Sequence, residues 1–184
     1  MGDFIGEDSL YSGVTGWYAP SMNIHRTAYS GRNFEYYSED SYISGVFGAA
    51  VTKAASAKGV YCYIKHFALN DQETNRQLIT TWATEQAIRE IYLAPFETTV
   101  KEGGATAVMC SMNRIGCVWT GASKALCTNV LRNEWGFVGA IVTDAETAYN
   151  ANKDVRLALV FGFGVIFSSV QWARYAKKAK KEGK

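Results

Sequence analysis

The run Val60–Phe67, VYCYIKHF, is apolar throughout except for Lys65 and His66 near its end. Its β-branched and aromatic residues predict a buried strand. Two later runs, Ala105–Ser111 and Val138–Val142, have the same character. Buried strands that recur along a chain with other elements between them are typical of a parallel sheet.

Helical stretches separate these runs. Helices are predicted at Ser44–Lys58, before Gly59, and at Ala122–Trp135. A third, Thr84–Glu102, should kink or restart at Pro95, because proline lacks the N–H and clashes one turn back. Val14–Asn23 is predicted to be a strand that enters a loop and is closed by Pro20. The remaining predicted elements are a helix at Val155–Val160, a strand at Gly164–Ser168 and a basic helix at Ser169–Lys181.

This alternation predicts an α/β fold that is either a doubly wound sheet or a (β/α) TIM-like barrel. No Gly-rich nucleotide-binding pattern follows any strand, which removes the main sign of the first fold. Polar residues instead follow strand after strand, which is where a barrel carries its chemistry. They are Asn23 to Arg26, Lys65-His66, Ser111 to Arg114 and Thr143-Asp144.

Composition excludes several classes of function. The 184 residues suffice for one domain, and the net charge of +2 favours neither polyanions nor membrane surfaces. The basic residues near the end form one tail, so no nucleic-acid partner is predicted. Four cysteines without a ligand-like spacing and two histidines predict no metal site, and no cofactor is expected.

Targeting signals are also absent from the start of the chain. Residues 1–8 carry acids rather than a basic start and an apolar run, so a cytoplasmic location is expected. The apolar segment 157–173 is shorter than a typical bilayer span and contains glycine, serine and glutamine. It is interpreted as a buried strand and helix rather than a membrane anchor.

Asp144 is the main candidate for catalysis, because it follows the predicted strand AIVT and should emerge at the rim. A carboxylate there can attack the anomeric carbon of a sugar, and it can equally cap the next helix. Lys65 and His66 reach one ligand together only if the backbone bends between them. Arg32 and Arg76 are surface residues by default.

Three motifs together resemble glycoside hydrolase family 3. They are APSMNIHR at 19–26 with GRNFEYYSED at 31–40, KHFALNDQETNR at 65–76, and WGFVGAIVTD at 135–144. The resemblance runs from about Gly13 to about Asp154. It implies a retaining mechanism with Asp144 as the nucleophile. It further implies a substrate-binding set made of Arg32, Lys65, His66, Arg76 and Met112, and an unusual peptide geometry at Lys65-His66 is expected.

The segment after Lys65-His66-Phe67 has no second histidine, so the resemblance implies the β-glucosidase-like branch of the family. That branch takes its general acid/base from a second domain. Substrates would be terminal β-glucosyl or β-xylosyl residues, as β-glucosides or oligosaccharides. Met112, Ala145 and the run Phe161–Phe167 depart from the family pattern near the expected pocket.

The length also departs from the family, because a barrel of this type needs roughly 250 residues. Residues 1–184 are therefore expected to form one incomplete barrel domain, lacking opening strands and a second domain, with 155–184 as a divergent strand and basic helix. Such a fragment should have little activity alone, unless a partner chain or a homo-oligomer completes it. The alternatives are a sugar-binding or regulatory subunit and a structural, membrane-associated subunit.

Overall fold

Four parallel strands form the main sheet, in a computed structural model that describes residues 1–77 and 79–144. Their order is β1 (Gly16–Trp17), β2 (Tyr61–Phe67), β4 (Ala107–Cys110) and β7 (Ala140–Thr143). Every neighbouring pair is parallel, so all four carboxyl ends lie at one edge. The predicted α/β class with a parallel sheet is confirmed.

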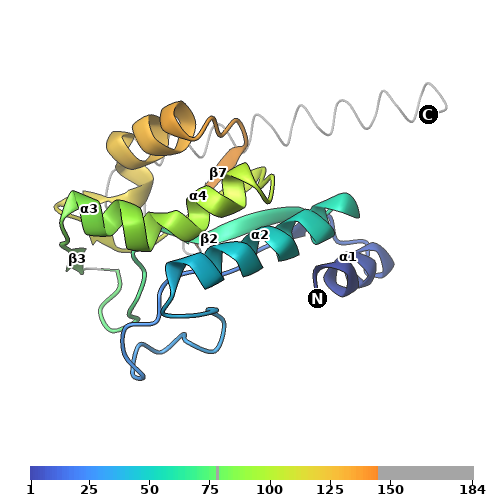
Figure 1. Ribbon diagram of the computed structural model, residues 1–184, viewed down its shortest axis with the longest axis horizontal. Helices are drawn as coiled ribbons and strands as arrows, with labels where there is room; N and C mark the ends of the chain where they lie inside the picture. The colour runs from blue at the N-terminus through green and yellow to red at the C-terminus, as the bar shows by residue number, and fades with distance from the viewer. Residues whose placement is uncertain (78, 145–184) are drawn as a thin grey trace. The chain divides into compact units, whose positions relative to one another are not determined.

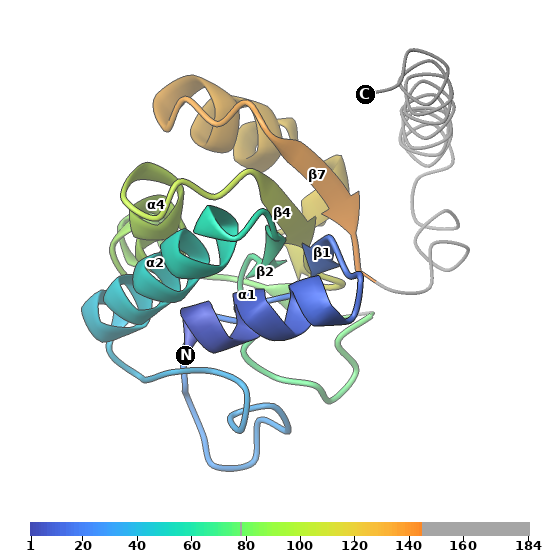
Figure 2. The same cartoon turned by 90° about the vertical axis from the view of Figure 1, so that its right-hand side faces the viewer.

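Helices α2 (Ser41–Ala57) and α4 (Ala94–Lys101) lie side by side along one face of this sheet (Figures 1 and 2). The core between them is apolar and includes Ile64, Phe67, Phe96, Val108 and Leu131. The ring of Phe67 packs edge-on against Phe96 at 5.2 Å and against Trp135 at 5.8 Å. On the opposite face Tyr61 is 57% exposed, so the first half of β2 is buried on one face only. The sequence had predicted a strand buried on both faces.

Helix α2 begins three residues before the predicted start, because Asp40 caps it. The Asp40 Oδ1 atom accepts a hydrogen bond from the Ile43 N–H at 3.0 Å, which satisfies one of the free donors of the first turn. At the other end Gly59 has φ 85°, the left-handed conformation that glycine adopts most readily after a helix. Helix α1 (Gly2–Tyr11), which no pattern indicated, packs on α2.

The predicted helix 84–102 is one helical path with a change of winding. It begins as α3 (Glu85–Ala87), continues as the π-helix η1 (Ile88–Leu93) and ends as α4. Pro95 occupies the first turn of α4, where its missing N–H has no partner to lose. The predicted restart at Pro95 is confirmed, and the wider π turn directly precedes it.

The predicted helix 122–135 is the π-helix η3 (Ala125–Glu134), preceded by the 3₁₀ turn η2 (Thr120–Ala122). Gly136 follows it with φ 72°. At Gly139 a Cβ atom would lie 2.0 Å from the Thr106 carbonyl oxygen, so only glycine lets β7 begin this close to β4. The Ala140 N–H then donates to that same carbonyl at 2.9 Å.

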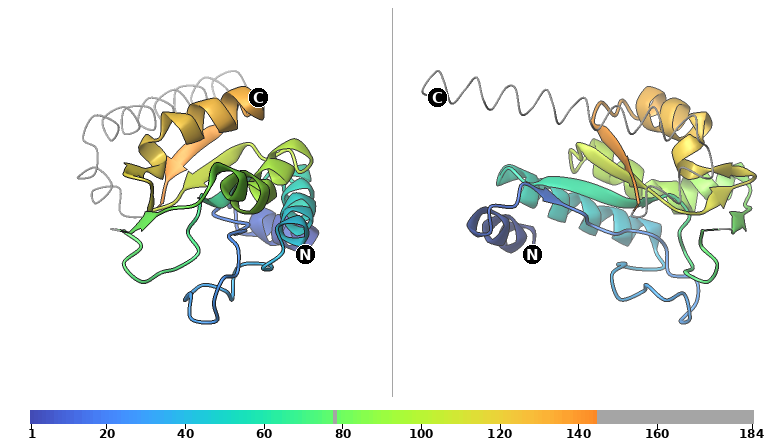
Figure 3. Two further views of the ribbon diagram at one scale, coloured as in Figure 1. Left: turned by 60° about the vertical axis from the view of Figure 1, so that its left-hand side comes forward. Right: turned by 180° about the vertical axis from the view of Figure 1, so that it is seen from behind.

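A small second sheet, also not predicted, joins β3 (Thr80–Thr81), β5 (Arg114–Ile115) and β6 (Val118–Trp119). The long loops 23–40 and 68–77 project from the same end of the main sheet (Figure 3). They carry Arg32 and Arg76, whereas Lys65 and His66 lie in β2 and Met112 follows β4.

In Val14–Asn23, predicted as a strand that enters a loop and is closed by Pro20, the strand covers Gly16–Trp17, and an isolated parallel bridge joins Ser21 to Lys65. A cis Ala19–Pro20 bond follows Gly16–Trp17, and proline cannot donate to a ladder. The elements expected at 155–160, 164–168 and 169–181 lie outside the described residues, as do the domain boundary at 155 and the apolar segment 157–173.

Candidate functional site

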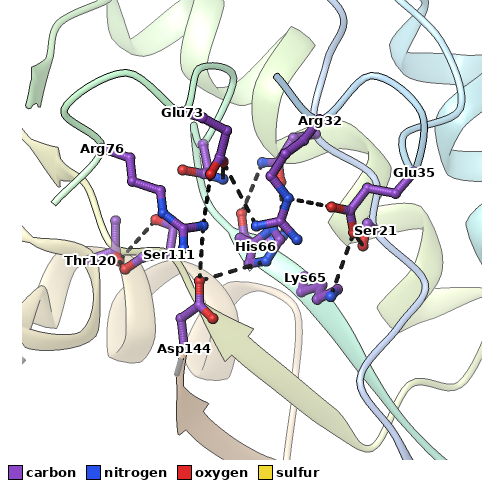
Figure 4. Close-up of polar contacts among 12 residues, drawn as sticks. Ser21, Arg32, Glu35, Lys65, His66, Glu73, Arg76, Ser111, Thr120 and Asp144 are labelled. Atoms are coloured by element: carbon purple, nitrogen blue, oxygen red, sulfur yellow. Dashed lines mark hydrogen bonds and ion pairs between the residues drawn. The ribbon is translucent and has the colours of Figure 1, made fainter. Parts of the chain in front are cut away.

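Six charged side chains, three of each sign, form an alternating network at the carboxyl ends of the strands (Figure 4). In order along the network they are Lys65, Glu35, Arg32, Glu73, Arg76 and Asp144. The structure thus brings together Arg32, Lys65, Arg76 and Asp144, which the sequence singled out separately, and His66 joins them at Asp144.

Asp144 directly follows β7 and is 8% exposed. Its Oδ2 atom lies 3.7 Å from His66 Nε2 and 3.8 Å from Arg76 Nη1. The carboxylate is therefore held between a ring nitrogen and a guanidinium at the edge of the sheet. The alternative role, capping of a following helix, concerns residues that lie outside the described part of the chain.

Lys65 and His66 form an irregularity in β2. Between Ile64 and Phe67 the register against β4 shifts by one residue, because Ile64 pairs with Val108 and Phe67 with Cys110. An extra residue in one strand re-aims the side chains there, so both neighbours reach the same site. Lys65 Nζ lies 3.6 Å from Glu35 Oε2, while His66 faces Asp144. The Lys65–His66 peptide bond is cis, as is Phe67–Ala68, which confirms the expected unusual geometry.

His66 is only 1% exposed. Burial, with the nearby cations Arg32, Lys65 and Arg76, lowers the pKa of this imidazole from 6.5 to about 2. The ring is therefore neutral throughout the physiological range. Its Nδ1 atom lies 3.4 Å from the Tyr36 hydroxyl, so both ring nitrogens face a polar group.

The loop after β2 supplies Glu73 and Arg76. Arg76 Nη1 lies 3.1 Å from Glu73 Oε2, and Arg32 Nη1 lies 3.7 Å from Glu73 Oε1. The Asn70 side chain donates to Glu73 Oε1 at 3.1 Å. Glu73 thereby links the two arginines across two loops that are distant in sequence.

Glu35 performs the same linking role on the other side of Arg32. Its carboxylate is bonded by the Arg32 Nε–H and, at 2.7 Å, by the Ser21 hydroxyl. Burial by itself raises the pKa of Glu35, but the hydrogen bonds from Arg32 and Ser21 and the charge of Lys65 outweigh it, so the pKa lies below its usual value. Glu35 is thus an ionised anchor for the cations.

Asn23 and Tyr36 belong to the site although sequence reasoning gave them no role. Asn23 is buried, and its amide makes two hydrogen bonds of 2.9 Å to His66, accepting from the backbone N–H and donating to the carbonyl. Tyr36 donates to the Asn70 carbonyl at 3.2 Å. Both residues lie inside the motifs at 19–26 and 31–40, so membership of a motif was the sequence feature that could have identified them. Met112 is also buried, at 1% exposure.

The arrangement suits a neutral, polyhydroxylated ligand. Ammonium and guanidinium groups donate several hydrogen bonds, and a carboxylate held beside them accepts bonds or acts as a nucleophile. In residues 1–77 and 79–144 no group of three potential metal ligands occurs. Within the same residues no helix is long and apolar enough to cross a bilayer.

Comparison with known proteins identifies the family. The model of the glycosyl hydrolase family 3 N-terminal domain matches residues 1–183. A β-glucosidase of Ruminococcus albus is 46% identical over 125 residues, or 68% of this chain and 13% of that protein. A β-glucosidase of Rhizobium radiobacter is 41% identical over 155 residues, or 84% of this chain and 19% of that protein.

Among solved structures, β-glucosidase 3B from Thermotoga neapolitana in complex with glucose is 40% identical. The match has a TM-score of 0.77 and covers 83% of this chain and 22% of that one. This chain therefore spans about a fifth or less of the length of these relatives. It belongs to glycosyl hydrolase family 3, and residues 1–183 match the N-terminal domain of that family.

Proposed function

We propose that this chain provides the nucleophile and the sugar-binding groups of a retaining β-glucosidase, with Asp144 as the nucleophile. The observation that carries the proposal is the position of Asp144 at the end of β7, with Oδ2 within 4 Å of both His66 Nε2 and Arg76 Nη1. Family membership and the names of the relatives support the reaction class.

In the first step Asp144 attacks the anomeric carbon of a terminal β-glucosyl residue, and the aglycone leaves with the bonding electron pair. Water then releases the sugar from the glycosyl-enzyme. Arg32, Lys65, His66 and Arg76 hydrogen-bond the hydroxyls of the reacting sugar. Their positions are fixed before substrate binds, which lowers the reorganisation that the transition state requires.

We infer that the general acid/base lies outside residues 1–77 and 79–144. A general acid must carry a proton at working pH, whereas Glu35 is held ionised by Arg32 and Ser21. Glu73 is engaged by both Arg32 and Arg76, so its carboxylate already serves as a structural link between the two loops. Another region or a partner chain would supply the acid, and its loss typically reduces the rate by about 10²–10⁴.

We further propose that the four parallel strands are an arc of a TIM-like barrel, with β1 and β7 at its two edges. The exposed side of β2, where Tyr61 lies, would face the interior of that barrel. Other strands, from elsewhere in the protein or from a second chain, would cover it. Met112, at 1% exposure, has almost no surface to offer a sugar, so its membership of the substrate-binding set stays a prediction.

The proposal is tested by trapping the glycosyl-enzyme. A 2,4-dinitrophenyl 2-deoxy-2-fluoro-β-glucoside has a leaving group that needs no protonation, so trapping does not depend on the missing acid. Mass spectrometry should find the fluoroglucosyl group on Asp144, in the tryptic peptide 133–153. Ordinary nitrophenyl β-glucoside should turn over slowly or not at all.

Two variants in the same peptide make the test specific. Asp144→Asn should abolish labelling, whereas Glu134→Gln, whose carboxylate pairs with Arg89 at the surface, should leave it unchanged. Absence of label while calorimetry detects glucose or gluconolactone binding would contradict the nucleophile assignment and favour a sugar-binding module. A label on another residue would also contradict it.

A further inference from the structure

Cys110 and Cys127 are two buried thiols in contact. Their Sγ atoms lie 3.9 Å apart, Cys110 at the end of β4 and Cys127 on η3. All four cysteines are free, but Cys62 is buried elsewhere beside Val60 and Ala55, and Cys117 is exposed. Of the four cysteines, which all lie in the described residues, Cys110 and Cys127 are the two whose sulfur atoms are in contact.

The pair lies directly behind the strand end that carries Asp144. Cys110 pairs with Thr143 in the β4–β7 ladder, one residue before Asp144. Cys127 Sγ donates to the Thr120 carbonyl at 3.3 Å, and the Thr120 hydroxyl donates to the Ser111 carbonyl at 2.7 Å. A change at the two sulfur atoms therefore acts on the backbone at the carboxyl end of β4.

The two thiols differ in reactivity. The hydrogen bond from Cys110 lowers the pKa of the Cys127 thiol, against the effect of burial, and Arg132 adds to the lowering. The same hydrogen bond and burial raise the pKa of Cys110. Cys127 is also the more accessible of the two, at 8% exposure against 1%. Peroxide therefore reaches Cys127 first.

We propose that Cys110 and Cys127 form a peroxide-sensitive thiol pair that closes to an intramolecular disulfide behind the Asp144 strand. Cys127 Sγ attacks one oxygen of hydrogen peroxide, the O–O bond breaks, and the other oxygen leaves as water after taking up the thiol proton. Cys110 Sγ then attacks the sulfenic sulfur of Cys127, the S–O bond breaks, and a second water leaves. Two thiols are oxidised by two electrons and one peroxide is reduced to two waters.

Closure needs only a local movement. A disulfide has an S–S distance of about 2.0 Å, so the two sulfur atoms approach by roughly 2 Å from their 3.9 Å separation. Closure thus requires rotation of the two side chains, a shift of η3 toward β4, or both. The inference stands on these contacts and does not depend on the glucosidase proposal.

Tryptic mapping tests the pair, because the four cysteines fall in four different peptides: 59–65, 102–114, 115–124 and 125–132. After brief treatment of the native reduced chain with hydrogen peroxide and alkylation of the remaining thiols, peptides 102–114 and 125–132 should be joined. Peptide 59–65 should be alkylated. Reduction should release the joined peptides.

Three controls make the result decisive. Cys117→Ser removes the exposed thiol and should leave the 102–114 to 125–132 link intact. Cys110→Ser should abolish the link and leave Cys127 as a sulfenic acid that dimedone captures. In denaturant, linkage should spread over all pairings. The proposal is overturned if native protein forms no 110–127 link while Cys117 oxidises, or if native and denatured chains give the same pairing.

Discussion

His66 Nε2 lies 3.7 Å from Asp144 Oδ2, and His66 Nδ1 lies 3.4 Å from the Tyr36 hydroxyl. A neutral imidazole carries its proton on one nitrogen only. With the proton on Nε2, the ring presents an N–H to the carboxylate and a lone pair to the Tyr36 hydroxyl, whose single proton can rotate between the Asn70 carbonyl and this nitrogen. The opposite tautomer would point a lone pair at the carboxylate, so the geometry favours the Nε2–H form.

We predict that nitrogen NMR finds the His66 proton on Nε2 and that Asp144→Ala moves the equilibrium toward the Nδ1–H form. The substitution removes the anion that the Nε2–H faces. The chain has only two histidines, so the spectrum holds two ring systems. His25 contacts the Tyr36 carbonyl instead of Asp144, so its signals provide the internal control. An Nδ1–H tautomer in the unsubstituted chain would contradict the assignment.

Asn23→Ala is expected to destabilise the fold and disturb the binding site together. It removes both hydrogen bonds that hold the His66 backbone, and each buried polar group left without a partner costs about 1–3 kcal/mol. Asn23→Asp keeps the acceptor for the His66 N–H but turns a carboxylate oxygen toward the His66 carbonyl. Its free energy of unfolding should therefore lie between those of the unsubstituted chain and Asn23→Ala. Urea unfolding measures both variants.

Asn33→Ala is the matched control for Asn23. The Asn33 amide bonds the Thr27 carbonyl in the exposed part of the same loop region, so its loss should cost less than that of Asn23. Equal losses of unfolding free energy in the two alanine variants would show that the buried Asn23 hydrogen bonds stabilise the fold no more than the exposed Asn33 contact does.

Two buried groups, His66 and Asp71, should change the free energy of unfolding with pH in opposite directions. The folded pKa of His66 is about 2 against 6.5, so between these values the unfolded chain holds one more proton and stability rises with pH. Burial raises the pKa of Asp71 from 3.8 to about 7, although the Ile24 N–H and Arg26 act against it. Between 3.8 and 7 the folded chain therefore holds the extra proton, and stability falls with pH.

The two effects cancel between about pH 4 and 6.5, and single variants should separate them. Asp71→Asn should make the slope of unfolding free energy more positive than in the unsubstituted chain by about 1.4 kcal/mol per pH unit. His66→Gln should make it more negative by a similar amount. Urea titrations at several pH values measure both slopes. Equal slopes in all three proteins would show that neither group titrates abnormally.

The main sheet was predictable because its strands are short, apolar and separated by helices. Val60–Phe67 and Ala105–Ser111 contain β2 and β4, and Val138–Val142 covers β7 except for its last residue, Thr143. The second sheet escaped prediction because its strands have two residues each, too few to show a period. Helix α1 escaped because the residues it buries, Gly2, Gly6 and Ser9, are small rather than apolar.

For the site, the sequence predicted which residues belong together but not what holds them. Three motifs indicated Arg32, Lys65-His66, Arg76 and Asp144. Glu35 and Glu73 lie inside those motifs, yet a carboxylate in a loop is a surface residue by default. Their role depends on two loops meeting, so that Glu73 contacts both arginines. Only the tertiary structure contains that information.

Arg76 joins Glu73 to Asp144, and its removal should slow covalent labelling of Asp144. Arg76→Met removes a charged hydrogen-bond partner worth about 1.5–3 kcal/mol, which corresponds to roughly 10–100-fold in the labelling rate. Arg76→Lys keeps the charge but loses the planar guanidinium whose Nη1 atom lies near both carboxylates, so it should retain part of the rate.

The matched control for this prediction is Arg89→Met. Arg89 also bridges two carboxylates, Glu85 and Glu134, but on an exposed surface, so its loss should leave the labelling rate unchanged. The fluoroglucoside measures all three variants, with urea unfolding run alongside to separate misfolding from a local effect. A folded Arg76→Met variant that labels as fast as the unsubstituted chain would show that Arg76 does not act on the reacting carboxylate.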